Sequence, residues 1–83
     1  MTSTTASSNF SAILGRNIKR ARKESGLTQR VTALRMNWRK TDSQAVSDWE
    51  RGVRRPSDEA LIVLGELFDK DIAWFYTDHE DQS

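Results

Sequence analysis

The sequence predicts a small all-α domain built from five short helices. Its 83 residues suffice for one domain, and its hydrophobic fraction of 36% suffices for one small core. Apolar side chains recur at helical spacing in consecutive segments, and Ser, Thr, Asp or Asn stands where each of these segments begins. No segment shows the alternation of apolar and polar residues that is typical of a strand. These observations favour helices packed around a single core.

The first predicted helix follows a polar N-terminal segment. Residues 1–9 are rich in Ser and Thr and lack apolar periodicity, so we expect a flexible tail there. Asn9 or Ser8 can cap a helix that begins near Phe10, and Gly26 ends this helix. The apolar positions of the helix are Leu14, Ile18 and Ala21. Their spacing places all three on one face.

The second predicted helix begins after Thr28, which can act as its N-cap, and continues to about Met36. Residues 37–41 form a connection. The third helix covers 43–51, with Asp42 or Thr41 as its N-cap and a glycine after its last residue. One side of the third helix is apolar, with Ala45, Val46 and Trp49. The opposite side is polar, with Ser43, Gln44, Ser47 and Asp48.

The last two helices begin after Ser57 and Asp71, and both residues are good N-caps. The fourth helix has an apolar face formed by Leu61, Ile62, Leu64, Leu67 and Phe68. The short fifth helix carries Ile72, Trp74, Phe75 and Tyr76. We expect the folded domain to span residues 10–77 and an acidic tail to occupy residues 78–83.

The charges are distributed unevenly between the two parts of the chain. Residues 1–56 carry 12 basic and four acidic side chains, a net charge of +8. Residues 57–83 carry one basic and eight acidic side chains, a net charge of −7. A basic part of this kind favours a polyanionic partner, and the acidic part can orient the domain, bind a protein or keep the chain in solution.

Several motifs of the chain, taken in order, resemble one family. The opening helix Leu14-Gly15-Arg16-Asn17-Ile18-Lys19-Arg20-Ala21-Arg22 and the fifth-helix ending Ile72-Ala73-Trp74-Phe75-Tyr76 fit the same pattern as three central motifs. These are Leu27-Thr28-Gln29, Val46-Ser47-Asp48-Trp49-Glu50-Arg51-Gly52 and Arg55-Pro56-Ser57. Together they resemble the phage repressor/Cro-like (XRE-type) helix-turn-helix family over residues 12–77. The resemblance implies a five-helix, lambda-repressor-like DNA-binding domain.

The resemblance implies that the helix 43–51 enters the major groove of DNA as the recognition helix. The chemistry of its polar side agrees with that role. Gln44 can make two hydrogen bonds to adenine, and Asp48 can accept one from the amino group of cytosine. Ser43 and Ser47 can bond to either kind of base pair. We therefore expect these four side chains to read bases.

Other positions are expected to contact the DNA backbone or to hold the fold. By resemblance, Gln29 binds a phosphate and braces the recognition helix, and Arg22 forms a structural salt bridge with Glu50. The remaining expected backbone contacts are cations beside the reading face: Arg30, Arg39, Lys40, Arg51, Arg54 and Arg55. Such contacts fix the register and provide most of the salt-dependent affinity.

The sequence departs from the family pattern in three places. The turn before the third helix is longer than usual, where Asn37 can supply a left-handed conformation. Trp38 in this turn can pack on the edge of the core or lie against the DNA backbone. Thr32 stands where the family usually has a large apolar residue, for which Val31 or Leu34 would compensate through a small rotation of the second helix. Asp69 stands where the family usually has a glycine.

The favoured function is a phage-type transcriptional repressor that binds a palindromic operator as a homodimer in the cytoplasm of a bacterial or phage-infected cell. The end of the fourth helix and the aromatics of the fifth are the expected dimer surface. The alternative is an antitoxin or another partner-binding module whose DNA binding is controlled by a protein such as an antirepressor. Residues 69–83 and the turn with Trp38 would then be the docking surfaces.

Several function classes are not expected. Cysteine is absent, and no apolar run approaches the roughly 18 residues of a membrane span. The start of the chain lacks the basic and apolar regions of a secretory signal. The single histidine, His79, stands in an acidic tail that we expect to be mobile, whereas a general base needs a fixed position. We therefore expect no catalytic site, no metal site, no cofactor and no membrane partner.

Overall fold

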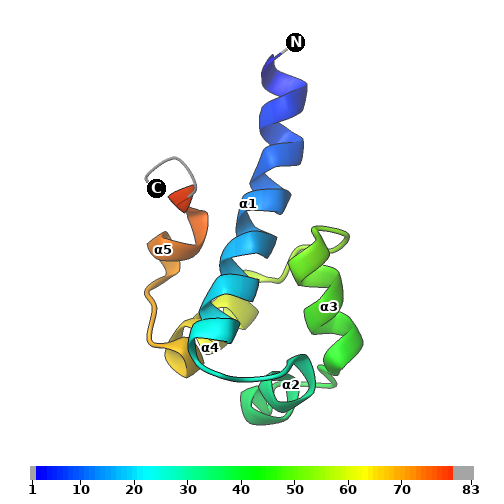
Figure 1. Ribbon diagram of the computed structural model, residues 1–83. Helices are drawn as coiled ribbons and strands as arrows, with labels where there is room; N and C mark the ends of the chain where they lie inside the picture. Colours follow the sequence, from blue (N-terminus) through cyan, green and yellow to red (C-terminus); the bar gives the residue numbers. More distant parts are fainter. Residues whose placement is uncertain (1, 80–83) are drawn as a thin grey trace.

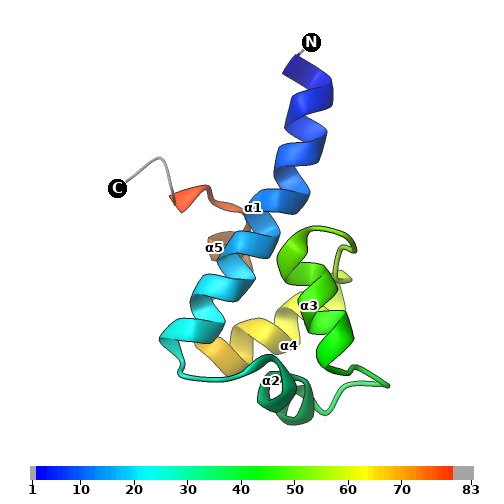
Figure 2. The same ribbon diagram turned by 45° about the vertical axis from the view of Figure 1, so that its right-hand side comes forward.

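The computed structural model describes residues 2–79, with side chains from residue 11 onward. This part of the chain contains five helices and no strand. The helices are α1 (Thr2–Glu24), α2 (Gln29–Met36), α3 (Ser43–Arg51), α4 (Asp58–Phe68) and α5 (Ile72–Tyr76). Helices α3 and α5 lie on opposite sides of α1, as both ribbon views show (Figure 1, Figure 2). The predicted all-α fold class is confirmed.

The first helix begins earlier than predicted. Its first residue is Thr2, and not a residue near Phe10. The segment 1–9, expected to be a flexible tail, is therefore helical from Thr2 onward. Residues 2–9 contain neither Gly nor Pro, and extending an existing helix is much easier than nucleating a new one. The predicted helix start was wrong because it relied on the lack of apolar periodicity, which reports burial and not helix formation.

The starts of the other four helices agree with the sequence. Each is capped by a side-chain oxygen that accepts a hydrogen bond from the backbone N–H three residues later. The caps are Thr28, Asp42, Ser57 and Asp71, with distances of 3.0, 2.9, 3.1 and 3.0 Å. Left-handed residues follow the first four helices, namely Gly26, Asn37, Gly52 and Asp69, with φ of 73, 46, 76 and 59°.

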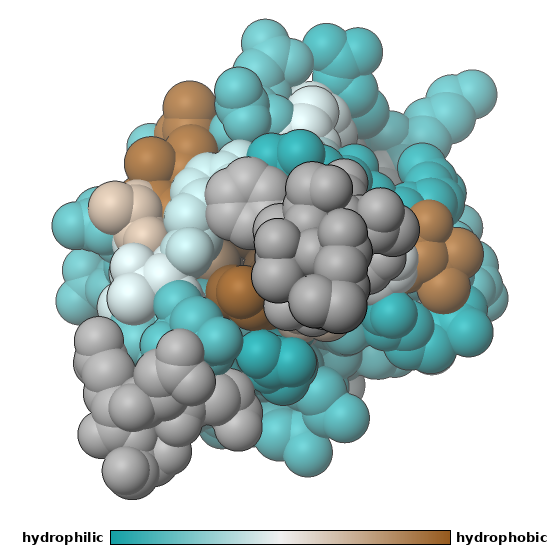
Figure 3. Space-filling view, turned by 90° about the horizontal axis from the view of Figure 1, so that it is seen from above, coloured by the Kyte–Doolittle hydropathy of each residue, from teal (hydrophilic) through white to brown (hydrophobic). Residues whose placement is uncertain are grey.

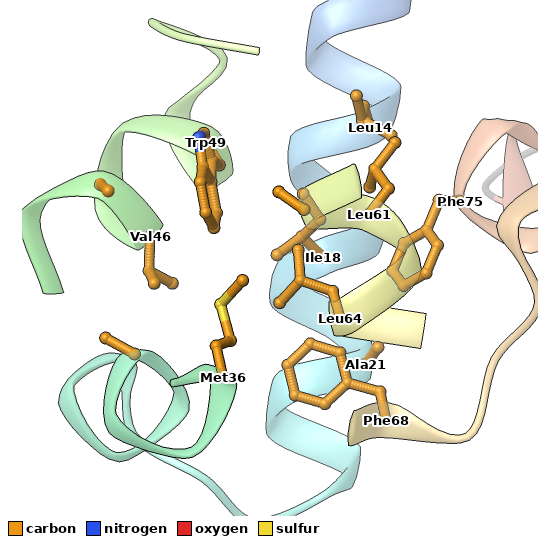
Figure 4. Close-up of a cluster of buried hydrophobic side chains, with 13 residues drawn as sticks. Leu14, Ile18, Ala21, Met36, Val46, Trp49, Leu61, Leu64, Phe68 and Phe75 are labelled. Atoms are coloured by element: carbon orange, nitrogen blue, oxygen red, sulfur yellow. The ribbon is translucent and has the colours of Figure 1, made fainter. Parts of the chain in front are cut away.

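The core lies where all five helices meet around α1 (Figure 4). Leu14, Ile18 and Ala21 of α1 face the apolar sides of the other helices, as their spacing predicts. The partners from those helices include Met36, Val46, Trp49, Leu61, Leu64, Phe68 and Phe75. Burial of each large apolar side chain stabilises the fold by about 1.5–3 kcal/mol. This core fixes α3 against α1 and α2.

A few side chains differ in burial from what the sequence predicts. Ile62 was assigned to the apolar face of α4 but is 52% exposed. Phe75 of α5 is fully buried and therefore cannot contact a partner, whereas Trp74 and Tyr76 are partly buried against the core.

Thr32 is fully buried, and its hydroxyl group has no hydrogen-bond partner among the described residues. The expected compensating rotation of α2 does not bring Leu34 inside, since it is 68% exposed.

Two residues of α1 set the positions of its neighbours. A methyl group on Gly15 would lie only 2.5 Å from the backbone oxygen of Glu50, so the backbones of α1 and α3 approach closely there. The buried side chain of Asn17 donates from Nδ2 to the backbone oxygens of Phe75 and Thr77, both at 2.7 Å. Gly15 therefore sets the distance to α3, and Asn17 ties α5 to α1.

The face of the molecule seen from the end where α1 begins is mostly hydrophilic among the described residues (Figure 3). On this face the hydrophobic areas are small and separated from one another (Figure 3). Among residues 2–79, no helix combines the length and the apolar character that crossing a membrane requires.

Candidate nucleic-acid interface

Helix α3 presents one side to the core and one side to solvent. Ala45, Val46 and Trp49 are buried. On the opposite side, Ser43 and Gln44 are exposed, and Ser47 and Asp48 are partly exposed. The four side chains predicted to read bases thus lie on the outward side of a helix that is anchored by its inward side. Such a side can enter a major groove without disturbing the core.

Asp48 is the centre of a charged cluster on this outward side. Its Oδ1 accepts hydrogen bonds from Gln44 Nε2 at 2.9 Å and from Arg51 Nη2 at 2.7 Å. Arg54 Nη1 lies 3.8 Å from Oδ2. The hydrogen bond from Gln44 lowers the pKa of the Asp48 carboxyl below its ordinary value, and Arg51 and Arg54 lower it further. The carboxylate is therefore ionised and held in place near neutral pH.

The C-terminal end of α3 is fixed to α1 by an ion pair. Arg22 Nε lies 2.6 Å from Glu50 Oε2, and Arg22 Nη2 donates to Glu50 Oε1 at 3.1 Å. Gln29 Nε2 also donates to Glu50 Oε1, at 3.0 Å. Glu50 thus joins the end of α3 to Arg22 of α1 and to Gln29, the first residue of α2. A phosphate contact by Gln29 stays a prediction.

The lengthened turn between α2 and α3 has two left-handed residues. They are Asn37 and Arg39, with φ of 46 and 54°. The backbone oxygen of Trp38 accepts a hydrogen bond from Thr41 Oγ1 at 2.7 Å, which closes the turn. The ring of Trp38 packs at the edge of the core, which is one of the two positions that the sequence left open. The added residues therefore form an ordered turn against the domain.

The basic side chains near α3 fall into two groups. Arg30 and Lys40 are exposed and make no ion pair with any residue in the described range 11–79. The others have partners on the protein. Arg39 lies over the Trp38 ring at 4.9 Å and near Glu59 at 3.4 Å, and Arg55 donates to Tyr76 Oη at 3.3 Å.

Three of the predicted backbone contacts gather at one hollow beside α3. Arg39 and Lys40 of the turn and Arg54 after α3 line this shallow pocket together with Trp49. Cations at such a place can bind the phosphates that border a groove when α3 lies in it.

Sequence reasoning missed three features of the structure. The close approach at Gly15 could have been inferred, because a glycine inside a helical pattern often marks tight packing. Asn17 carried a signal as well, since it stands among the apolar positions of α1. The contact of Asp48 with Arg51 also had a signal, since the two residues are three apart in one helix, whereas the contact with Arg54 had none, because it depends on the path of the chain after α3.

The acidic end of the chain lies partly outside the described residues. Glu80 and Asp81, which the sequence places beside Asp78 and His79, are among the residues that the structure does not describe. Within the described range, His79 Nε2 lies 2.9 Å from the backbone oxygen of Trp74. No group of three or more potential metal-ligating side chains occurs in that range.

Comparisons with known proteins identify the family. A family model described as helix-turn-helix matches residues 18–75, which is more than half of the chain and includes α2, the turn and α3. No curated protein and no solved structure matches the chain. The five helices, the outward side of α3 and the family match agree. The chain belongs to the Cro/C1-like (XRE-type) helix-turn-helix family and is a DNA-binding transcriptional regulator in the general sense of that family.

Proposed function

We propose that the protein is a sequence-specific repressor that binds a palindromic operator as a homodimer, with α3 in the major groove. The observation that carries this proposal is the outward side of α3. It combines Gln44 and Ser43, which can bond to base edges, with two exposed cations near the start of α3, Arg30 and Lys40. Repression is the simplest mode of action for a small domain, because occupying a site is enough to block it.

The phosphate contacts of the proposal follow the positions of the cations. Arg30 and Lys40 are the strongest candidates, because neither has to leave a protein carboxylate to bind a phosphate. Arg51 and Arg54 stand beside Asp48, so their interaction with DNA competes with an existing contact. The proposed roles of Arg39 and Arg55 are peripheral, since each contacts an aromatic ring of the protein.

A homodimer would use the groove between α4 and α5. Ile62 and Ile72 are both exposed and line this groove with Gly65 and Lys70. Exposed apolar side chains at a groove are typical of protein interfaces. Phe75 takes no part in this surface, since it belongs to the core.

The test is the selection of bound sites from a random duplex library at two salt concentrations. A recovered palindrome supports a dimeric regulator, and its half-site spacing reports the dimer geometry. In the same selection, the variant Ile62→Glu should enrich only a half-site, because the substitution disrupts the proposed dimer surface. Its melting temperature should equal that of the original protein. Lack of any enriched sequence with the unchanged protein would refute sequence-specific binding.

One observation favours control by a protein partner as a second candidate function. Leu34 is exposed and lines a pocket with Arg30 and Ser43, next to the start of α3. A partner that covers this apolar side chain would also cover the outward side of α3. The protein would then act as an antitoxin or as the target of an antirepressor. Binding of such a partner should be lost in Leu34→Glu and should compete with operator DNA.

A further inference from the structure

The outward side of α3 contains a hydrogen bond between two side chains that were both predicted to read bases. Gln44 Nε2 donates to Asp48 Oδ1 at 2.9 Å, across one turn of the helix. An ionised carboxylate can only accept hydrogen bonds. The carboxylate must therefore face the NH₂ end of the Gln44 side chain and not its carbonyl end. The chemistry of the pair, and not only the geometry, fixes the orientation of the amide.

Asp48 is the fixed member of this pair. Its side chain is only 13% exposed and is held from the other side by Arg51 and Arg54. Gln44 is exposed, and Asp48 is the only described residue to which its side chain makes a hydrogen bond. Hydrogen bonds to a charged acceptor are roughly twice as strong as those between neutral groups. The orientation of the Gln44 amide is thus imposed by a carboxylate that is itself immobilised.

The orientation of an amide matters for reading adenine. Adenine offers an acceptor, N7, and a donor, the N6 amino group, and a glutamine bonds to both with one N–H and its carbonyl oxygen. Gln44 keeps one N–H and Oε1 for this purpose while its other N–H bonds to Asp48. Rotating the Gln44 amide by half a turn would exchange its NH₂ group and Oε1. Oε1 would then face the Asp48 carboxylate, and neither group could donate a hydrogen bond to the other.

We propose that Asp48 is a positioning residue that determines the specificity of Gln44 by fixing which way its amide faces in the groove. This inference rests on the proposed function of sequence-specific DNA binding. It assigns Asp48 a different role from direct contact with cytosine. The lone pairs of the carboxylate already accept from Gln44 and Arg51, with Arg54 close to the second oxygen. Asp48 acts on the base through Gln44.

The experiment compares two duplexes and four proteins. The duplexes are the selected operator and the same operator with the A·T pair under Gln44 inverted to T·A. The proteins are the original chain, Asp48→Asn, Gln44→Ala and the double variant. Asparagine has the shape of aspartate but can donate or accept, so it supports both orientations of the Gln44 amide. The readout is the ratio of the Kd values for the two duplexes. Removing the charge of Asp48 raises the affinity for both duplexes equally, so this effect cancels in the ratio.

The original chain should prefer the selected operator by about tenfold or more. Asp48→Asn should reduce this preference below about threefold, and Gln44→Ala should abolish it. In the Gln44→Ala background, Asp48→Asn should change no base preference. The control Glu24→Gln removes one exposed charge at the end of α1 and should leave the preference intact. The proposal would be overturned if Asp48→Asn left the preference for the selected operator unchanged. It would also be overturned if Asp48→Asn altered the preference at another base pair, both in the original chain and in the Gln44→Ala variant.

A second readout needs no DNA. The side-chain NH₂ resonances of Gln44 in the free protein should shift in Asp48→Asn, and the backbone spectrum should show that the fold is retained. If these resonances stay in place, the contact does not exist and the proposal fails even where an operator is found. If no operator is selected, the proposed function fails and the specificity role falls with it. The Gln44 resonances then still report whether the contact exists.

Discussion

Arg22 of α1 and Glu50 of α3 form an ion pair with two contacts, of 2.6 and 3.1 Å, and both side chains are largely buried. The pair joins the helix that carries the proposed reading face to the longest helix of the domain. Breaking a buried pair leaves one charge without its partner, which typically costs about 3–5 kcal/mol. We expect Arg22→Ala to approach the lower end of this range, since Gln29 still donates to Glu50.

The measurement for this first prediction is urea unfolding of Arg22→Ala beside Arg20→Ala. Arg20 and Glu24 form an exposed pair at 3.8 Å, and such pairs contribute about 0–1 kcal/mol. The double variant with Met at positions 22 and 50 should recover much of the lost stability, because it leaves no unpaired charge. Equal losses in Arg22→Ala and Arg20→Ala would contradict this account.

The second prediction concerns Gly15. In an ordinary helix interior, Gly→Ala stabilises by roughly 0.5–1 kcal/mol. At Gly15 the added methyl group would lie 2.5 and 2.6 Å from the backbone oxygens of Glu50 and Trp49. Backbone atoms cannot move aside as a flexible side chain can, so we expect Gly15→Ala to destabilise by about 1–3 kcal/mol. Thermal unfolding checks the sign, with the exposed Lys19→Ala as the control. A raised melting temperature would show that α3 does not pack so closely.

The third prediction concerns Asn17, which bonds to the backbone of α5 and the residue after it. Asn17→Asp keeps the shape of the side chain but replaces the donor by an acceptor that faces the oxygens of Phe75 and Thr77. We expect it to destabilise more than Asn17→Ala, which we expect to cost about 1–3 kcal/mol. Hydrogen exchange of the α5 amides should speed up in both variants. Slower exchange in Asn17→Asp would be incompatible with the donor role.

The fourth prediction concerns the unpaired hydroxyl group of Thr32. A buried polar group without a hydrogen bond costs about 1–3 kcal/mol, and valine has nearly the same shape. We expect Thr32→Val to raise the free energy of unfolding by about 1 kcal/mol. Thr32→Ser keeps the hydroxyl and removes a methyl group, so it should have the opposite effect. Denaturant unfolding of the two variants separates them. A less stable Thr32→Val would mean that the hydroxyl group has a partner in solution.

The fifth prediction concerns phosphate binding by Arg30. We expect Arg30→Ala to weaken binding to all duplexes similarly and to reduce the slope of log K against log salt by about one unit. The control is Arg16→Ala, because Arg16 lies 3.5 Å from Asp78 at the acidic end of the chain. Binding titrations at several salt concentrations give the slopes. Identical slopes for Arg30→Ala and the original chain would remove Arg30 from the interface.

Much of the fold could be predicted because the signals are local. A Thr, Ser or Asp before a helical pattern caps the helix by bonding to its own neighbours, as Thr28 and Ser57 do. Burial was harder to predict, because the apolar pattern of α4 includes Ile62, which is 52% exposed. The least predictable feature was the contact between Asp48 and Arg54. Arg54 follows Gly52, and the distance between the two side chains depends on the chain direction after that residue.

The close contact at Gly15 also bears on how such a protein acquires new targets. The position of α3 depends on backbone packing and on inward side chains, whereas Ser43 and Gln44 contribute nothing to the core. Residues on the outward side can therefore be exchanged without a loss of stability that later mutations would have to restore. Natural variation or laboratory evolution can retarget the protein by altering a few codons of one helix, while the rest of the gene stays under selection for the scaffold.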